Sequence, residues 1–196
     1  MSRLALIAVL VAAGAASIGS AAGQVSAETP PPCPRALGIV DRTTQAPLIY
    51  LPADPATPEA CPIRSRAGTG LFWYGAWKTD WPGADLAVQA LRQVWTAAAG
   101  TAQATARFDT VAGPGYAWHE IIRNDGFENL NVAGSVRRTM KVTHEREGFD
   151  GNSYHSVITL WKDVDTGMTI YTNYIHIAGA PEPNVAWDPL VIVGGK

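Results

Sequence analysis

The sequence predicts an α+β fold, in which one amphipathic helix packs on a curved antiparallel sheet of about four to six strands. Two observations lead to this fold class. Residues 84–99 carry apolar side chains at helical spacing, whereas the segments after residue 100 place apolar side chains between regularly spaced turn signals. No internal repeat is visible in the chain. This order of elements favours a single sheet that is covered by the helix.

The helix is predicted to follow a buried strand. Residues 70–78 are rich in large apolar and aromatic side chains, which is typical of a buried strand. Asp80 is a suitable N-cap with Pro82 in the first helical turn, and Gly100 provides a stop signal. Between them, one helix face is predicted to carry Ala87, Val88, Leu91, Val94, Trp95 and Ala98.

Further strands are predicted after the helix from apolar segments and the turns that separate them. The expected strands are residues 104–111, 116–123, 130–146, 154–163 and 168–178, and residues 190–193 form a possible edge strand. Turns are expected at residues 124–126, 148–151 and 165–167. This layout is similar to that of cystatin-like and other cone-shaped folds. A closed antiparallel β-barrel with the helix outside is the alternative.

The N-terminus has the pattern of a secretory signal peptide. Arg3 precedes an apolar run over residues 4–13, and small residues lead to the motif Val25-Ser26-Ala27. We expect residues 1–27 to be removed, with the mature chain beginning between residues 24 and 28. The apolar run is too short to span a membrane, so we expect an exported protein, periplasmic or extracellular, with no transmembrane segment.

Residues 28–69 are rich in proline, and a long helix is therefore excluded there. We predict an extended arm in which residues 37–40 and 48–51 pair as a small hairpin. Cys33 and Cys61 are the only cysteines of the chain, and in an exported protein they most simply form a disulfide. Such a bond closes a loop of roughly 28 residues and contributes about 3–4 kcal/mol. The remaining residues, 70–196, are expected to form the α+β domain.

Composition excludes several kinds of partner. The chain has 15 lysine and arginine residues, 17 aspartate and glutamate residues and a net charge of −2. With no basic stripe or cluster, the sequence gives no indication of binding to nucleic acid or to an anionic membrane. Only 16% of the residues are charged, while seven tryptophans and six tyrosines are present. Aromatic side chains in such numbers can fill a core or line a small-molecule site, and a protein partner is also possible.

The best candidate site depends on strand register. Along residues 130–146 the even-numbered side chains are mostly apolar, which predicts a buried face. Arg138 and His144 fall on this face, where a polar group needs a partner or a ligand. Two registers fit the turns; both place His144 and His176 on one face, and only one adds His155 to them. We expect one cavity lined by Glu120, Arg138, His144, Tyr174 and His176.

Three classes of function fit this prediction. The first is an exported protein that binds a small, partly apolar ligand in a cavity of the curved sheet. The second is a small periplasmic enzyme that uses Glu120 or His176 as a general acid or base. The third is a protein-interaction or inhibitor module of the cell envelope, which would use the proline-rich arm and an exposed sheet edge. No cofactor and no metal are expected, because the sequence has no recognisable cofactor motif or metal-ligand spacing.

Overall fold

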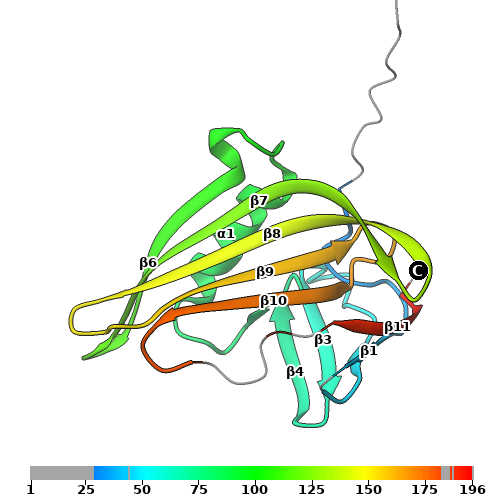
Figure 1. The fold of residues 1–196 in the computed structure, drawn as a ribbon, viewed down its shortest axis with the longest axis horizontal. Helices are drawn as coiled ribbons and strands as arrows, with labels where there is room; N and C mark the ends of the chain where they lie inside the picture. The colour runs from blue at the N-terminus through cyan, green and yellow to red at the C-terminus, as the bar shows by residue number, and fades with distance from the viewer. Residues whose placement is uncertain (1–28, 44, 182–185, 187, 196) are drawn as a thin grey trace, which may run out of the picture.

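The computed structural model describes residues 29–43, 45–181, 186 and 188–195 (Figure 1). Two antiparallel sheets and one α-helix, α1 (Ala84–Thr96), make up most of this part of the chain. The α+β prediction with antiparallel sheets is therefore confirmed. The predicted signal peptide, residues 1–27, lies outside the described residues. No helix among the described residues is long and apolar enough to cross a membrane.

The larger strands form a five-stranded sheet in which each strand pairs with its neighbour in the chain, in the order β10-β9-β8-β7-β6. Figure 1 shows these strands running side by side across the molecule. The strands are β6 (Thr105–Gly113), β7 (Tyr116–Val132), β8 (Ser135–Phe149), β9 (His155–Asp163) and β10 (Thr169–Ala178). Because β6 and β10 are the two ends of this order, the sheet is open, and the closed-barrel alternative does not describe it.

A second, six-stranded sheet has the order β11-β1-β2-β3-β4-β5. Its strands are β1 (Gly38–Arg42), β2 (Leu48–Tyr50), β3 (Ala60–Ser65), β4 (Gly68–Trp73), β5 (Trp77–Lys78) and β11 (Pro189–Gly194). The predicted hairpin is present as β1 and β2, but the rest of the expected arm also holds strands. The predicted strand over residues 70–78 is interrupted: residues 70–73 belong to β4, residues 74–76 form a turn, and residues 77–78 are β5. The division of the chain into an arm and a domain stays a prediction.

One edge strand of the six-stranded sheet comes from the far end of the chain. β11 pairs with β1, and Ile39 lies opposite Val193. The predicted edge strand at residues 190–193 is therefore present, on the sheet that the sequence did not predict. The predicted disulfide is confirmed: Cys33 and Cys61 are bonded, with their Cα atoms 5.3 Å apart. It ties the segment before β1 to the start of β3.

Helix α1 has the predicted buried face but different ends. Its N-cap is Gly83, in a left-handed conformation and without a side-chain cap, so the predicted Asp80 cap is wrong. The helix ends at Thr96, three residues before the expected end. Its apolar face packs on β6 and β7 and on the aromatic side chains of Tyr74 and Trp77. The helix thus covers one part of the five-stranded sheet and leaves the rest to the second sheet.

The predicted turn at residues 124–126 is wrong, because these residues form a bulge inside β7. Asn124 accepts a hydrogen bond from the Gly126 backbone N–H over 2.9 Å. Its side-chain amide donates to the carbonyl oxygens of Val94 and Ala97 at the end of the helix. The turn residues are therefore used to attach the sheet to the helix. The chain reverses eight residues later, at Ala133-Gly134, where both residues have positive φ angles.

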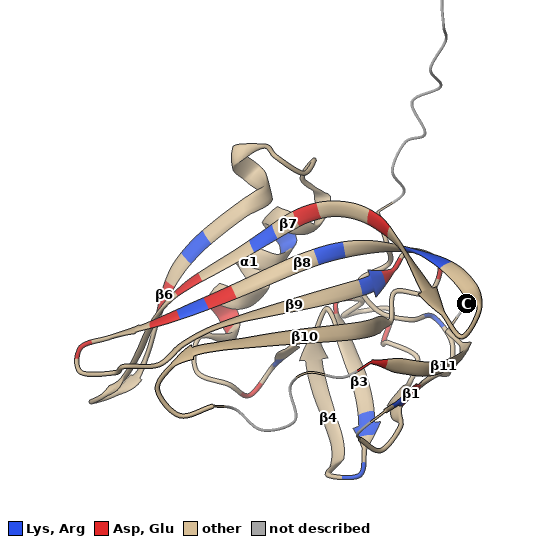
Figure 2. Ribbon diagram, in the orientation of Figure 1, with Lys and Arg blue, Asp and Glu red and all other residues tan. Residues whose placement is uncertain are grey.

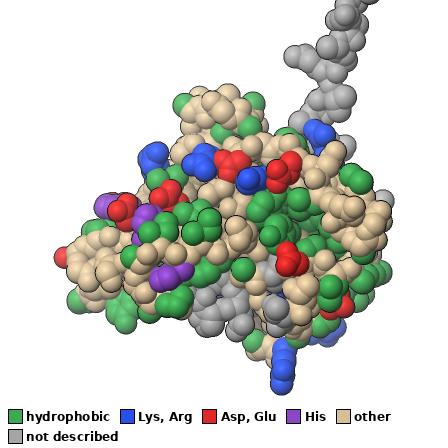
Figure 3. Space-filling view, viewed as in Figure 1, with side chains coloured by type: hydrophobic (Ala, Val, Ile, Leu, Met, Phe, Trp, Pro, Cys, Tyr) green, Lys and Arg blue, Asp and Glu red, His purple; other side chains and the backbone are tan. Residues whose placement is uncertain are grey.

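Two apolar clusters hold the layers together. One joins the helix to the five-stranded sheet, and the other joins the two sheets through Cys33, Tyr50, Cys61, Met168 and Ile170, among others. Within the second cluster the Tyr50 hydroxyl donates to the Thr169 carbonyl and accepts from the Thr169 N–H, over 3.3 and 3.1 Å. The outer surface of the five-stranded sheet carries charged and histidine side chains (Figures 2 and 3). The inner face is enclosed by the helix and the six-stranded sheet.

Candidate functional site

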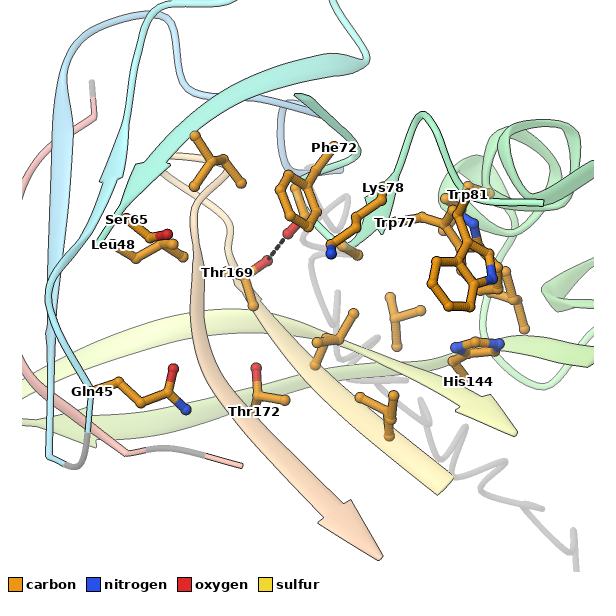
Figure 4. A pocket seen from close by; sticks show the side chains of 18 of the residues that line it. Gln45, Leu48, Ser65, Phe72, Trp77, Lys78, Trp81, His144, Thr169 and Thr172 are labelled. Carbon is orange, nitrogen blue, oxygen red and sulfur yellow. Dashed lines mark hydrogen bonds between the residues drawn. The ribbon is translucent and has the colours of Figure 1, made fainter. Parts of the chain in front are cut away.

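A cavity of about 580 Å³ lies between the two sheets (Figure 4). Its walls come from strands of both sheets and from the helix, so residues far apart in the sequence meet there. Sites for small molecules commonly have volumes of roughly 300–1,000 Å³ and mostly apolar walls. The size of this cavity falls within that range.

The middle of the cavity is apolar. Leu48, Ile63 and Phe72 of the six-stranded sheet line one wall, and Val142 and Leu160 of the five-stranded sheet line the opposite wall. The alternation of side chains along a strand explains the second wall, because even-numbered residues of β8 and β9 share the inner face. Such walls favour an apolar ligand body, since its burial removes apolar surface from water.

Polar side chains gather at the two ends of the cavity. Gln45 and Ser65 lie near one end, and Lys78, Trp81 and His144 lie near the other (Figure 4). Polar groups at fixed places in an otherwise apolar site orient a ligand and select among ligands. The end at His144 has more ionisable side chains, because Lys78, His144 and Arg146 all line the cavity there.

At that end His144 is paired with a buried carboxylate. Its Nε2 lies 2.6 Å from Oε2 of Glu120, whose side chain is completely buried. Because a carboxylate accepts, Nε2 carries the proton of this bond, and Nδ1 is the ring nitrogen left for other contacts. His144 itself lines the cavity, whereas Glu120 lies behind it. This arrangement orients an imidazole toward a ligand.

Arg146 completes this cluster. Its Nε lies 3.4 Å from the same Glu120 oxygen, and the residue is only 6% exposed. Aromatic rings surround its guanidinium, with distances of 4.7–5.8 Å from its central carbon to the rings of Trp77, Trp81, Trp118 and Tyr154. Cation–π contacts of this kind hold a charged group in place where water is scarce. Arg146 therefore brings a fixed positive charge to this end of the cavity.

The structure brings together only part of the predicted site. Glu120 and His144 are in contact, as expected for a shared cavity. Arg138 is exposed, lies over the ring of Phe127 at 5.2 Å and does not line the cavity. Neither Tyr174 nor His176 is among the cavity residues; His176 is exposed and its ring lies 6.4 Å from that of Tyr174. The ligand-binding role of all five residues stays a prediction.

Strand register explains this outcome. In the expected register without His155, Val142, Ile158 and Tyr174 lie side by side. Ile158 does lie opposite Tyr174, but it pairs with His144 rather than Val142, so β8 is shifted by two residues against β9. His144 and His176 do share a face, but His176 sits next to a bulge near the free end of edge strand β10. His155 points to the other face, where it contacts Glu145 at 3.1 Å. The three histidines therefore do not form a row.

Sequence reasoning missed Arg146 and the aromatic rings around it. The signal was present, since Arg146 has the same even-numbered spacing as Met140, Val142 and His144 on the buried face. Arg146 is, however, the last residue of the predicted strand 130–146, and a side chain at the end of a strand can reach water. β8 instead continues to Phe149, so the side chain remains covered.

Lys162 is a second buried cation that the sequence did not reveal. It is fully buried, and its Nζ donates to the carbonyl oxygen of Tyr74 over 2.7 Å. Burial lowers the pKa of this lysine to about 7, with the nearby Asp163 opposing the change. The amine also lies 5.6 Å from the ring centre of Trp95. Lys162 thus connects β9 to the turn between β4 and β5, just behind the cavity.

Among the described residues, no group of three histidine, cysteine, aspartate or glutamate side chains could hold a metal ion. Comparison with models of protein families, with curated proteins and with solved structures gave no match for this chain. Inferences about function therefore depend on the geometry of the cavity and of the Glu120–His144–Arg146 cluster.

Proposed function

We propose that this protein binds a small, partly apolar ligand in the cavity between its two sheets. The observation that carries the proposal is the cavity of about 580 Å³ with an apolar middle and polar ends. The ligand body would lie between Phe72 and Leu160, and its polar part would reach His144. The five-stranded sheet would then act as the wall of a cone-like binding chamber.

Export to the periplasm or the cell exterior belongs to the same proposal. The disulfide between Cys33 and Cys61 is consistent with an oxidising compartment. The apolar N-terminal run and small-residue motif supply the sequence support for export. A binding protein of this kind would meet ligands outside the cytoplasm.

The neutral dye N-phenyl-1-naphthylamine provides a direct test of binding, because its fluorescence rises in apolar surroundings. We expect saturable binding to the protein, and at least tenfold weaker binding to Leu160→Trp, in which the larger side chain fills the cavity. Ile175→Trp is the matched control, since Ile175 is exposed on β10. Absence of saturable binding, or equal binding by both variants, would show that the cavity is not the site.

A second candidate is proton transfer on a bound ligand, and the buried contact between Glu120 and His144 favours it. With Nε2 held by the carboxylate, Nδ1 could accept a proton next to a ligand carbonyl. His176 is exposed, so His144 takes over the acid–base role first considered for that residue. The expected result is deuterium uptake next to the carbonyl of 2-decanone in heavy water, slowed roughly 100-fold by His144→Asn and unchanged by His176→Asn. Equal rates for the two variants would contradict it.

A further inference from the structure

Among the described residues, the charged side chains that line the cavity are all positive. Arg42, Lys78 and Arg146 line it together with His144, and no aspartate or glutamate of the described part of the chain does. The chain as a whole has more acidic than basic residues, so this bias is not a property of its composition. A cavity with cationic walls favours an anionic group on its ligand.

At the Arg42 end of the cavity, the guanidinium already forms hydrogen bonds within the protein. The Arg42 Nε donates to the Ala46 carbonyl over 2.9 Å, and Nη1 donates to the Gln45 side-chain oxygen over 2.6 Å. These bonds use the guanidinium to hold the loop between β1 and β2. The opposite end is therefore the better place for a ligand anion.

Lys78 supplies an available charge at that opposite end. Its side chain makes no ion pair or hydrogen bond with another described residue; it is exposed to solvent, and its amine points into the space between the sheets (Figure 4). Lys78 directly follows Trp77, whose ring centre lies 4.5 Å from that of His144. The amine, the imidazole and Arg146 thus belong to one end of the cavity.

Hydrogen-bond donors outnumber acceptors around Arg146. The indole N–H groups of Trp77 and Trp118 and the hydroxyl of Ser156 are buried and have no partner among the described residues. Both rings pack on Arg146, and Ser156 lies directly across from it on β9. Among the described residues, Oε1 of Glu120 is an unpaired acceptor there, and the Ser156 hydroxyl can also accept. Buried polar groups normally have a hydrogen-bond partner, so the two unpaired indole N–H groups favour an acceptor at this end.

We propose that the ligand carries a single carboxylate, held by Lys78 and Arg146 at the end of the cavity that His144 also lines, with its apolar body toward Phe72 and Leu160. This inference rests on the ligand-binding function proposed above. The charge count matches a monoanion, because Glu120 offsets one of the two permanent positive charges at this end. A carboxylate accepts up to about four hydrogen bonds and so fits a donor-rich end.

Competition experiments with two ligands of equal chain length test this inference. Decanoate and 1-decanol are used to displace N-phenyl-1-naphthylamine from the intact mature protein. We expect decanoate to bind at least tenfold more tightly than 1-decanol. Lys78→Met should weaken the binding of decanoate at least threefold and leave the binding of 1-decanol unchanged. Lys141→Met is the matched control, since Lys141 lies over Trp161 on the outer face and does not line the cavity.

Each outcome is decisive. If the dye binds but the two ligands compete equally, or if Lys78→Met weakens both ligands alike, the carboxylate proposal is overturned while cavity binding stands. If the dye does not bind, cavity binding is overturned and the carboxylate proposal fails with it. If Lys78→Met binds decanoate more weakly but 1-decanol equally well, and Lys141→Met binds both as before, cavity binding and the carboxylate proposal are both supported.

Discussion

The two sheets of this protein are built in opposite ways. The five-stranded sheet has strands of 9–17 residues, and each strand pairs with the next one in the chain. The six-stranded sheet has strands of 2–6 residues and needs β11, from the far end of the chain, to pair with β1. Local pairing costs less loop-closure entropy than such distant pairing. We infer that the six-stranded sheet depends more on cross-links.

Three links join or brace the six-stranded sheet. The disulfide holds the segment before β1 to β3, Lys162 reaches from β9 to the turn after β4, and Tyr50 reaches from β2 to Thr169 on β10. The last two also define the distance between the sheets, and hence the depth of the cavity. Removing each link tests how far the two sheets differ.

Removal of the disulfide is expected to have the largest effect. The double variant Cys33→Ser/Cys61→Ser should lose about 2–5 kcal/mol of unfolding free energy, because the unfolded chain is no longer constrained. Hydrogen exchange should show that amides of β1–β3 lose protection before those of β7 and β8. Urea unfolding followed by hydrogen-exchange mass spectrometry measures both quantities. Equal loss of protection in both sheets would contradict the proposed difference between them.

Replacement of Lys162 by methionine should change the pH dependence of stability. The pKa of this lysine is about 7 in the folded protein and near 10.5 when unfolded. Between these values the unfolded chain binds more protons, so this group makes stability rise with pH from about 7 to 10. Below pH 7 the Lys162 amine is charged in the folded protein as well, and its burial lowers the free energy of unfolding by the full amount. Lys162→Met should therefore be more stable than the original protein by about 2 kcal/mol at pH 6, after loss of the bond to Tyr74.

The same comparison at pH 10 provides the check on Lys162. There the buried amine is neutral in the folded state, so the advantage of Lys162→Met should shrink or reverse. Lys141→Met, on the outer face, should show no such trend. Unfolding free energies from denaturant titrations at pH 6, 8 and 10 are sufficient. A difference that stays constant across this range would show that Lys162 does not titrate as argued.

A smaller effect is expected from Tyr50→Phe, about 1–2 kcal/mol, because two hydrogen bonds to the Thr169 backbone are lost. Burial raises the pKa of Tyr50 to about 12. Since the unfolded tyrosine ionises near pH 10, the stability of the unsubstituted protein should fall between pH 10 and 12. The stability of Tyr50→Phe should fall less over the same range. Tyr116→Phe is the control, because Tyr116 is exposed. Equal pH dependence in the two variants would exclude this role for Tyr50.

The contrast between the sheets also explains what could be predicted from the sequence. β9, β10 and the turn between them are close to expectation, because alternation and turn residues act over short distances. The strands of the six-stranded sheet are short and interrupted by proline, so residues 28–69 resembled an extended arm. Pairing of β1 with β11 has no local signal at all.

For the candidate site, local patterns identified the buried face but not the positions along it. His144 and Glu120 were placed on this face and do meet. Arg138 was expected beside them, but it lies on the far side of the bulge at residues 124–126, opposite Asn129. The bulge and the length of the turn after β8 set which side chains face one another, and neither is visible in apolar periodicity.

The central claim is that a ligand lies between the two sheets, and methyl NMR during titration with decanoate tests it most directly. We predict that methyl signals of Leu48 and Ile63 from one sheet and of Val142 and Leu160 from the other shift together and saturate at one equivalent. The exposed Val136 should not respond. Shifts confined to one sheet, or to exposed methyl groups such as that of Val136, would contradict binding in the cavity.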